Sequence, residues 1–440
     1  MIILYASRAH WRVIVTYALV GALSTRPALP ARAQALPSGY QAQQVQPVGY
    51  SDLNGRPGFK LSVREYRGRW YLYMGHFWHR GWSIVDVTDP AAPRVVKFVP
   101  GPDNTFTGQM ELAGNTMVTG LEKILPGFGG DSTKTYQEGV LIWDISDPVN
   151  PRQVGHYRTG GTGTHRNFYA GGRYLHLAAG MPGYQGNIYV VVDISDPTKP
   201  VEAGRWWVPG QHTADGEQPA EPETSLHGPP YVLDNQAYLS YGAAGMIILD
   251  ISEVAKPKLV GQLDFSPPFH QKFGVHTVLP IPGRKVAYVN SEDVSYGKGA
   301  LHHASIVDIS RPQQPRLLAT LPVPVPPAGT PYRSFEEKGG WSGPHNISML
   351  LHNPDVQPQG NLLFMAHFNA GLRVFNVANS RLPSEVGYFL PPEPTKRYGP
   401  MPQGKLALQT EDVLVDRRGF VYITHKNQGL WILRYTGPTP

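Results

Sequence analysis

The chain has 440 residues, enough for one large or two ordinary domains, and its 48 glycines and 43 prolines are typical of a turn-rich β-protein. With 16% charged and 11% aromatic residues it is not a disordered chain, and its lack of cysteine excludes disulfides, thiolate metal sites and cysteine nucleophiles. The formal net charge of +6 includes four arginines in the first 35 residues, a segment without Asp or Glu. Without that segment, 35 Lys and Arg remain against 33 Asp and Glu, so the charge does not predict a nucleic-acid partner.

The first 35 residues have the pattern of a secretory signal peptide. A basic start is followed by the apolar run Val13–Leu23 and then by small residues at Ala31, Ala33 and Ala35. The run is shorter than the roughly 20 residues that span a bilayer, so we expect cleavage rather than an uncleaved anchor. The sequence therefore predicts a periplasmic or secreted protein with a signal peptide over residues 1–35, one domain over residues 36–440, and no transmembrane segment after removal of the signal.

A short motif recurs along the rest of the chain. Ile84–Pro90 reads Ile-Val-Asp-Val-Thr-Asp-Pro, and close copies occupy Ile142–Pro148 and Val192–Pro197. Weaker copies follow, and a degenerate one lies at Leu430–Tyr435. Six copies are marked by the same acidic or amide position: Asp86, Asp144, Asp193, Asp250, Asp308 and Asn376. Repetition at about this spacing predicts a repeat architecture.

Each repeat has the composition of a small antiparallel sheet. An apolar, β-branched run ends in Asp-Ile-Ser-Asp-Pro, in which Asp and Ser cap a tight turn and Pro prevents further pairing. A Tyr-rich strand such as Trp70–Tyr73 precedes the run, and a short strand such as Gln153–His156 follows the turn. With one more strand at the start, each unit has four strands, and no segment has the 3.6-residue period of a long helix. The sequence predicts an all-β protein, a seven-bladed β-propeller.

The N-terminal part of this domain supplies the strand that the last repeat lacks. Val45–Tyr50 has the pattern of a fourth strand but precedes the first complete unit, whereas the unit over Glu411–Tyr435 has no fourth strand. We therefore expect the N-terminal strand to complete the last blade and close the ring. The Ile-Val-Asp-Ile-Ser-Asp-Pro units resemble those of the LVIVD-repeat family of exported bacterial and archaeal propellers. The resemblance covers the chain from about residue 45 and implies the fold, but little about the chemistry.

Four histidines occupy one structural position in neighbouring repeats, just before or within the first strand of each unit. They are His165, His227, His276 and His345; the corresponding positions in the other units hold Lys60, Glu111 and Glu411. The first strand of a propeller blade lines the central channel, so we predict that these imidazoles converge on one Fe, Cu, Mn or Zn ion, with carboxylates orienting the rings. Carotenoid cleavage oxygenases, a different propeller family, are similar in this arrangement though not in sequence. The alternative is a structural His, as in WD-repeat propellers, but such a His should recur in most blades.

Further candidate residues should lie on the same face. We predict catalytic roles for Glu111 and Glu411, as groups that orient the rings or transfer protons, for Tyr241, and for Arg166, which would bind an anionic substrate unless it is an ordinary surface arginine. The long loops 121–138, 206–225, 291–302 and 322–342 suggest a pocket that covers this face and takes a small-molecule or glycan ligand.

Two classes of function fit this pattern. The first is a metal-dependent enzyme, an oxidase or oxygenase by the geometry, or a lyase or hydrolase as the enzymatic alternative. The second is a non-catalytic binding or scaffold propeller whose histidines are structural. Bound metal discriminates between the two classes.

Overall fold

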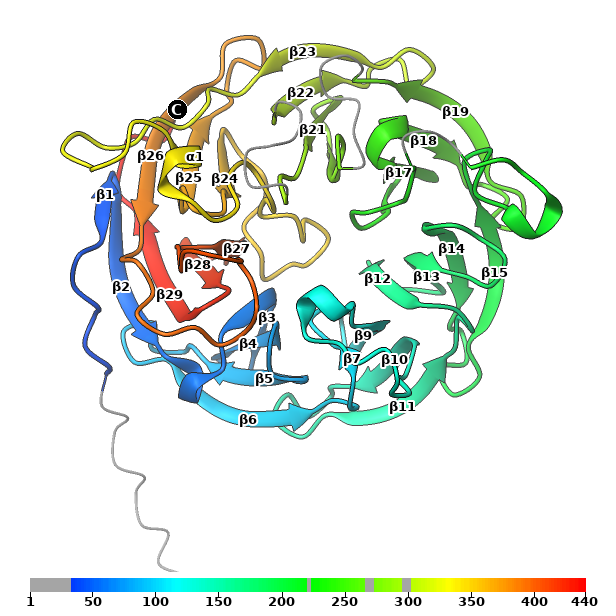
Figure 1. Cartoon of the computed structure of the whole chain (residues 1–440), viewed down its shortest axis with the longest axis horizontal. Helices are drawn as coiled ribbons and strands as arrows, with labels where there is room; N and C mark the ends of the chain where they lie inside the picture. The colour runs from blue at the N-terminus through cyan, green and yellow to red at the C-terminus, as the bar shows by residue number, and fades with distance from the viewer. Residues whose placement is uncertain (1–32, 220–222, 266–272, 295–301) are drawn as a thin grey trace, which may run out of the picture. The chain divides into compact units, whose positions relative to one another are not determined.

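The computed structural model describes residues 33–219, 223–265, 273–294 and 302–440, and Ala33–Pro440 form one compact unit. The predicted signal peptide falls almost wholly on residues 1–32, outside the described residues. Within the compact unit, antiparallel sheets stand around a common centre, each with one of its edge strands innermost (Figure 1). Among the described residues, helical structure is confined to short turns, namely α1 (Phe335–Lys338), η1 (Leu53–Gly55), η2 (Pro126–Phe128), η3 (Thr213–Asp215) and η4 (Gly242–Ala244).

Three of the four-stranded sheets use consecutive strands of the chain. They contain β3 (Gly58–Tyr66), β4 (Arg69–His76), β5 (Gly81–Asp86) and β6 (Arg94–Pro100); β16 (Tyr231–Leu233), β17 (Gln236–Ser240), β18 (Met246–Asp250) and β19 (Lys258–Leu263); and β20 (Thr277–Ile281), β21 (Val286–Asn290), β22 (Ala304–Asp308) and β23 (Arg316–Thr320). This is the four-stranded unit that the repeats predict.

One sheet has nine strands because two four-stranded groups touch at one pair of residues and the short strand β7 pairs with β9. Its strands are β7 (Thr105–Phe106), β8 (Met110–Ala113), β9 (Thr116–Lys123), β10 (Gly139–Asp144), β11 (Arg152–Tyr157), β12 (Gly163–Phe168), β13 (Tyr174–Gly180), β14 (Asn187–Asp193) and β15 (Val201–Trp206). The groups β8–β11 and β12–β15 meet where Gly163 of β12 pairs with Glu122 of β9.

The last two sheets each take a strand from the N-terminal segment. They contain β1 (Gln41–Gln43) with β24 (Leu362–Ala366), β25 (Leu372–Asn376) and β26 (Ser384–Leu390), and β2 (Val45–Ser51) with β27 (Thr410–Val415), β28 (Phe420–His425) and β29 (Gln428–Tyr435). The pairing of β2 with β29 follows the expected order, whereas the pairing of β1 with the outer strand β26 was not anticipated. Figure 1 shows β1 and β2 running along the outside of these two sheets.

The repeated motif forms the turns between the third and fourth strands. In each repeat the marker side chain accepts a hydrogen bond from the backbone N–H two residues later, from Asp86 with Thr88 to Asn376 with Ala378. This local hydrogen bond holds the tight turn, as the sequence predicts.

Glycines in the fourth strands allow neighbouring sheets to approach closely. A Cβ on Gly155 would stand 1.8 Å from the carbonyl oxygen of Pro197 in the next repeat's turn, and one on Gly49 of β2 would stand 2.1 Å from that of Pro90. Only a residue without a side chain fits such contacts. The N-terminal strand therefore packs against the first repeat as β11 packs against the third.

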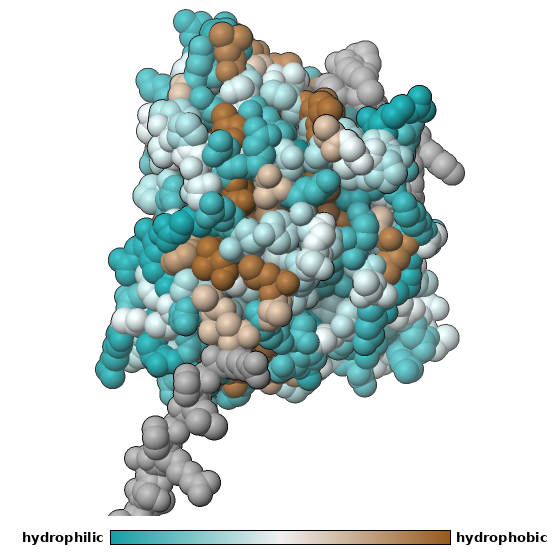
Figure 2. Space-filling model, turned by 90° about the vertical axis from the view of Figure 1, so that its left-hand side faces the viewer, coloured by the Kyte–Doolittle hydropathy of each residue, from teal (hydrophilic) through white to brown (hydrophobic). Residues whose placement is uncertain are grey.

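Apolar side chains fill the spaces within and between the sheets. One buried cluster joins the last two sheets and includes Val45, Phe389 and Trp431, so the N-terminal strand is part of the core. On the face over β1, β2 and β26, exposed apolar residues lie in small groups among polar ones (Figure 2). No helix among the described residues is both long and apolar enough to cross a bilayer.

Candidate metal centre

The four aligned histidines meet at the centre of the ring. The Nε2 atoms of His165 and His227 are 3.3 Å apart, and the ring centroids of His227 and His276 are 4.8 Å apart. The ring of His345 lies 5.0 Å from that of His276. The fold therefore brings together four side chains that are far apart in the sequence.

Local backbone geometry aims these side chains into the channel. The pairing of β12 with β13 slips between Thr164 and Arg166, which places His165 in a β-bulge, and a similar slip between Thr410 and Asp412 contains Glu411. A bulge bends the strand and redirects the side chain of the extra residue. His227 and His276 instead precede β16 and β20 and donate their backbone N–H groups to the last residues of β17 and β21. His345 precedes the isolated bridge between Ile347 and Met365 and donates its N–H to Ala366 at the end of β24.

A carboxylate that the sequence analysis did not select lies among the rings. Glu292 follows β21 in a predicted loop, and its Oε2 is 3.1 Å from Nε2 of His227 and 3.8 Å from Nε2 of His276. Its Oε1 is 3.6 Å from Nε2 of His345. One ligand atom from each of His227, His276 and Glu292 lies within 4.8 Å of the others, so this group has the composition and spacing to hold a metal ion.

The hydrogen bonds at the other ring nitrogens direct the lone pair to Nε2 in two of the histidines. Nδ1 of His165 lies 3.0 Å from both carboxylate oxygens of Glu122, and Nδ1 of His345 lies 2.6 Å from the backbone carbonyl of Glu411. These oxygens accept hydrogen bonds, so Nδ1 carries the proton and a neutral ring keeps its lone pair on Nε2. In His276, Nε2 accepts a hydrogen bond of 3.2 Å from Nη2 of Arg166, and Nδ1 lies 2.8 Å from the Thr277 hydroxyl, so a metal ion at this Nε2 would displace the contact with Arg166.

Burial keeps the imidazole rings of His227, His276 and His345 neutral. Desolvation lowers the pKa of His227 to about 4 and that of His345 to about 3, and it holds the pKa of His276 well below the ordinary value. Burial opposes ionisation of Glu292, but interactions with His276 and His227 outweigh it and hold the pKa of this carboxyl below its usual range. Neutral imidazoles and an ionised carboxylate are the forms that bind metal ions.

Two of the predicted catalytic residues, Glu411 and Arg166, lie beside the central histidines. Oε1 of Glu411 is 2.8 Å from Nζ of Lys426, and its Oε2 is 3.6 Å from Nδ1 of His345. Arg166 is buried at 3% exposure rather than an ordinary surface arginine. Its guanidinium also contacts Oε1 of Gln109 at 3.4 Å.

Glu111 and Tyr241 make contacts away from the rings. The carboxylate of Glu111 accepts a hydrogen bond of 2.6 Å from the backbone N–H of Tyr169, and the buried hydroxyl of Tyr241 donates one of 3.3 Å to the carbonyl of Trp206. Their catalytic roles stay predictions. Lys60, at the equivalent position of the first repeat, forms a buried ion pair of 3.3 Å with Asp412. Among the described residues, Glu122 and Glu292 are the acidic residues at His165 and His227.

The sequence indicates only weakly that Glu122 and Glu292 lie at the central site. Each lies at or just beyond the end of a second strand, β9 or β21, where the connecting loop opens toward the channel. They fall in the long loops 121–138 and 291–302 that the sequence predicts on this face, but no motif distinguishes them from the other loop residues. Their common feature is an acidic side chain at the end of a second strand.

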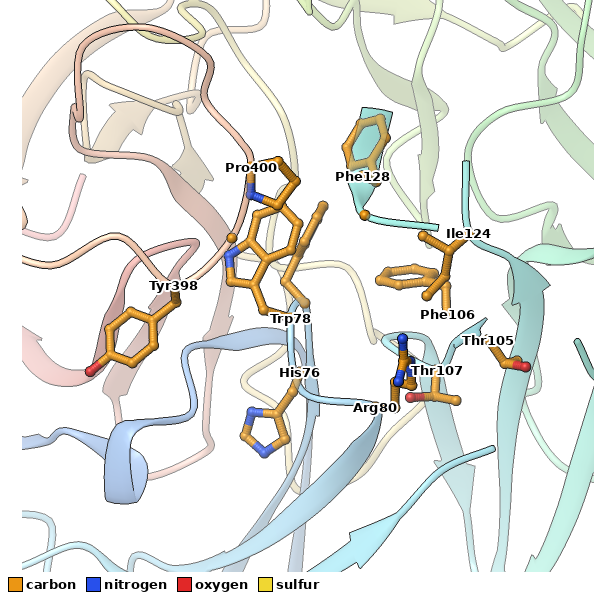
Figure 3. Close-up of a pocket in the computed structure, with 13 residues that line it drawn as sticks. His76, Trp78, Arg80, Thr105, Phe106, Thr107, Ile124, Phe128, Tyr398 and Pro400 are labelled. Carbon is orange, nitrogen blue, oxygen red and sulfur yellow. The ribbon is translucent and has the colours of Figure 1, made fainter. Parts of the chain in front are cut away.

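A cavity of about 930 Å³ opens beside the rings. Its lining includes His165, His227, Glu292, His345 and Glu411. A second pocket of about 140 Å³ adjoins it and is lined by His76, Trp78, Arg80 and Tyr398 among others (Figure 3). Phe77, Phe106, Ile124 and Phe128 line both spaces, so a single layer of side chains separates them.

Solved structures with a similar fold are β-propellers. The periplasmic gluconolactonase PpgL of Pseudomonas aeruginosa is 13% identical with a TM-score of 0.54, covering 83% of this chain and 96% of that chain. The Cps50 (Swd1) β-propeller domain of Myceliophteria thermophila is 11% identical with a TM-score of 0.53, covering 85% and 96%. At this identity the likeness shows the fold alone, and it defines the chain as a β-propeller.

Three segments of the chain match a known repeat. Residues 136–159, 183–207 and 231–264 match the LVIVD repeat, so the chain contains LVIVD repeats, as its sequence predicts. No curated protein matches the chain.

Proposed function

We propose that this chain is an exported, seven-bladed propeller that binds one transition-metal ion among its central histidines and oxidises or oxygenates a small molecule in the adjoining cavity. The separation of the nine-stranded sheet into β8–β11 and β12–β15 supports the blade count. The pairing of β2 with β29 and the contact of Gly49 with Pro90 support closure of the ring. The predicted leader, together with the periplasmic location in the name of PpgL, supports export.

The convergence of His227, His276 and Glu292 carries the proposal. Two histidines and one carboxylate with open positions are the ligand set of non-haem iron oxygenases and of hydrolytic zinc sites, so this group favours iron or zinc over Cu or Mn, and we propose iron. His165 and His345 stand at the edge of the same group and would complete or adjust the ligand set. Bound iron would supply the redox chemistry, for which the imidazole and carboxylate ligands of this site are suited.

The surrounding residues would position the substrate and hold protons. Arg166 presents a buried guanidinium to a polar group of the substrate, and Glu122 fixes the ring of His165 through its Nδ1–H. Burial raises the pKa of Glu411 and lowers that of Lys426, which brings the proton affinities of this contacting pair closer together. The pair is therefore the best candidate for proton transfer at the cavity wall.

Elemental analysis of the mature, untagged protein tests the metal site. We expect about one equivalent of iron, and loss of most of it in the His227→Ala/His276→Ala and Glu292→Gln variants. His156→Gln is the matched control, because His156 lies on the outer strand β11 and contacts the carbonyl of Glu138. Titration of the metal-free protein with Fe²⁺, Cu²⁺, Mn²⁺ and Zn²⁺ by calorimetry ranks the metals without an activity assay.

The metal content of the protein distinguishes a metal-dependent enzyme from a non-catalytic binding propeller. Retention of zinc alone would favour a lyase or hydrolase over an oxygenase. No metal in the purified protein and none taken up on titration would refute the metalloenzyme and leave the non-catalytic binding propeller.

A further inference from the structure

One wall of the large cavity is built from aromatic rings in mutual contact. The ring centroids of Phe59, Phe77 and Phe106 are 5.0 to 5.6 Å apart in edge-to-face arrangements. Phe128 continues the group 6.0 Å from Phe77, and Trp341 lies 6.1 Å from Phe128. These five rings, called the aromatic wall here, all line the cavity.

The aromatic wall reaches the metal centre directly. The ring of Phe59 lies 6.3 Å from that of His345, and the guanidinium carbon of Arg166 is 5.7 Å from the Phe59 centroid. On the other side Phe273 packs edge-on against His227, with centroids 4.7 Å apart. A ligand that rests on the wall therefore has its end beside the metal-binding group.

Apolar side chains and one lysine surround the aromatic wall. Ile124, Leu125, Val294 and Met401 also line the cavity, and Nζ of Lys426 lies 3.9 Å from the ring centroid of Phe77 and 4.0 Å from that of Trp341. Figure 3 shows Phe106, Phe128 and Ile124 gathered on one side of the smaller pocket, across from Tyr398. A glycan site needs hydrogen-bonding groups beside its aromatic rings, whereas the rings of this wall contact mainly other rings.

We propose that the cavity binds an aromatic compound with one polar, oxygen-bearing group, its rings on the aromatic wall and its polar end toward Arg166 and the central histidines. This inference deepens the proposed function and rests on it for the chemistry, but the binding step needs no metal. Edge-to-face rings present both positive edges and negative faces, so they favour aromatic rings over saturated rings of similar size.

The binding of a matched pair of ligands tests the inference. Calorimetry compares 4-phenylphenol with its saturated counterpart 4-cyclohexylcyclohexanol, and with cellotetraose, on the mature protein before and after metal removal with EDTA. We expect 4-phenylphenol to bind about tenfold more tightly than the saturated alcohol in both forms, and cellotetraose not to bind.

Leucine variants of the wall separate ring contacts from simple packing. Phe106→Leu/Phe128→Leu should weaken 4-phenylphenol three- to tenfold and leave the saturated alcohol unchanged. Phe420→Leu is the matched control, because Phe420 lies on β28 against Arg434 rather than in the cavity.

Equal affinity for the two ring systems, preferential binding of cellotetraose, or no binding of 4-phenylphenol would overturn the inference. The proposed function can be refuted separately. Binding of 4-phenylphenol without uptake of metal would support the aromatic ligand and refute the metal-dependent enzyme. Uptake of metal without preference for the aromatic ligand would refute this inference alone.

Discussion

The buried carboxyl of Glu111 should make the stability of this propeller depend on pH. Complete burial raises its pKa from 4.5 to about 8, although the hydrogen bond from Tyr169 and the charge of Lys60 act in the opposite direction. The folded state therefore binds this proton more tightly than the unfolded state. The stability it contributes is fully present below pH 4.5 and is lost as the pH rises through 8.

The size of the effect follows from the two pKa values. At about 1.4 kcal/mol per pH unit, a group with pKa 4.5 unfolded and about 8 folded lowers the free energy of unfolding by about 4 kcal/mol between pH 5 and pH 9. Glu111→Gln keeps the shape of the protonated carboxyl and cannot ionise. We expect the variant to gain about 4 kcal/mol over the wild type across this range.

Reversible urea unfolding of the metal-free proteins at pH 5, 7 and 9 measures the difference. The buried histidines titrate in both proteins, so their contribution cancels in the comparison. Glu253→Gln is the control, since this glutamate is exposed and forms an ion pair of 3.7 Å with Lys256, and its curve should stay parallel to the wild type. Parallel curves for Glu111→Gln as well would refute the assignment of a raised pKa.

Three further predictions concern packing and the metal centre. Gly155→Ala should cost at least 2 kcal/mol in urea unfolding, because its Cβ would collide with the Pro197 carbonyl, whereas Gly360→Ala, in open space, should change little; equal losses would contradict the packing argument. Glu122→Gln should weaken metal binding 10- to 100-fold by calorimetry while the melting temperature of the metal-free protein stays the same, since Glu122 orients His165; unchanged affinity would remove it from the site. Metal at 100 times its dissociation constant should stabilise the fold by about 2.7 kcal/mol in thermal unfolding, and an unchanged melting temperature would argue against a site in the folded state.

The sequence alone determined the repeating architecture. The turns at Asp86 and its counterparts depend on hydrogen bonds between residues two positions apart, so the local sequence of each repeat is enough to form its turn. Short β-branched runs without a 3.6-residue period predict the sheets. The common position of four histidines in neighbouring repeats predicts that their side chains converge: His165, His227, His276 and His345. These features are local or periodic, and a single chain displays them.

Tertiary structure decided the features that no repeat contains. Glu292 and Glu122 come from the ends of second strands, and neither lies near its histidine in the sequence, so only the arrangement of the sheets around the channel brings each carboxylate to a ring. Arg166 looks like a surface residue in the sequence and is buried in the folded chain. The pairing of β1 with β26 likewise depends on where the ends of the chain meet, because an edge strand takes whichever partner the fold brings alongside it.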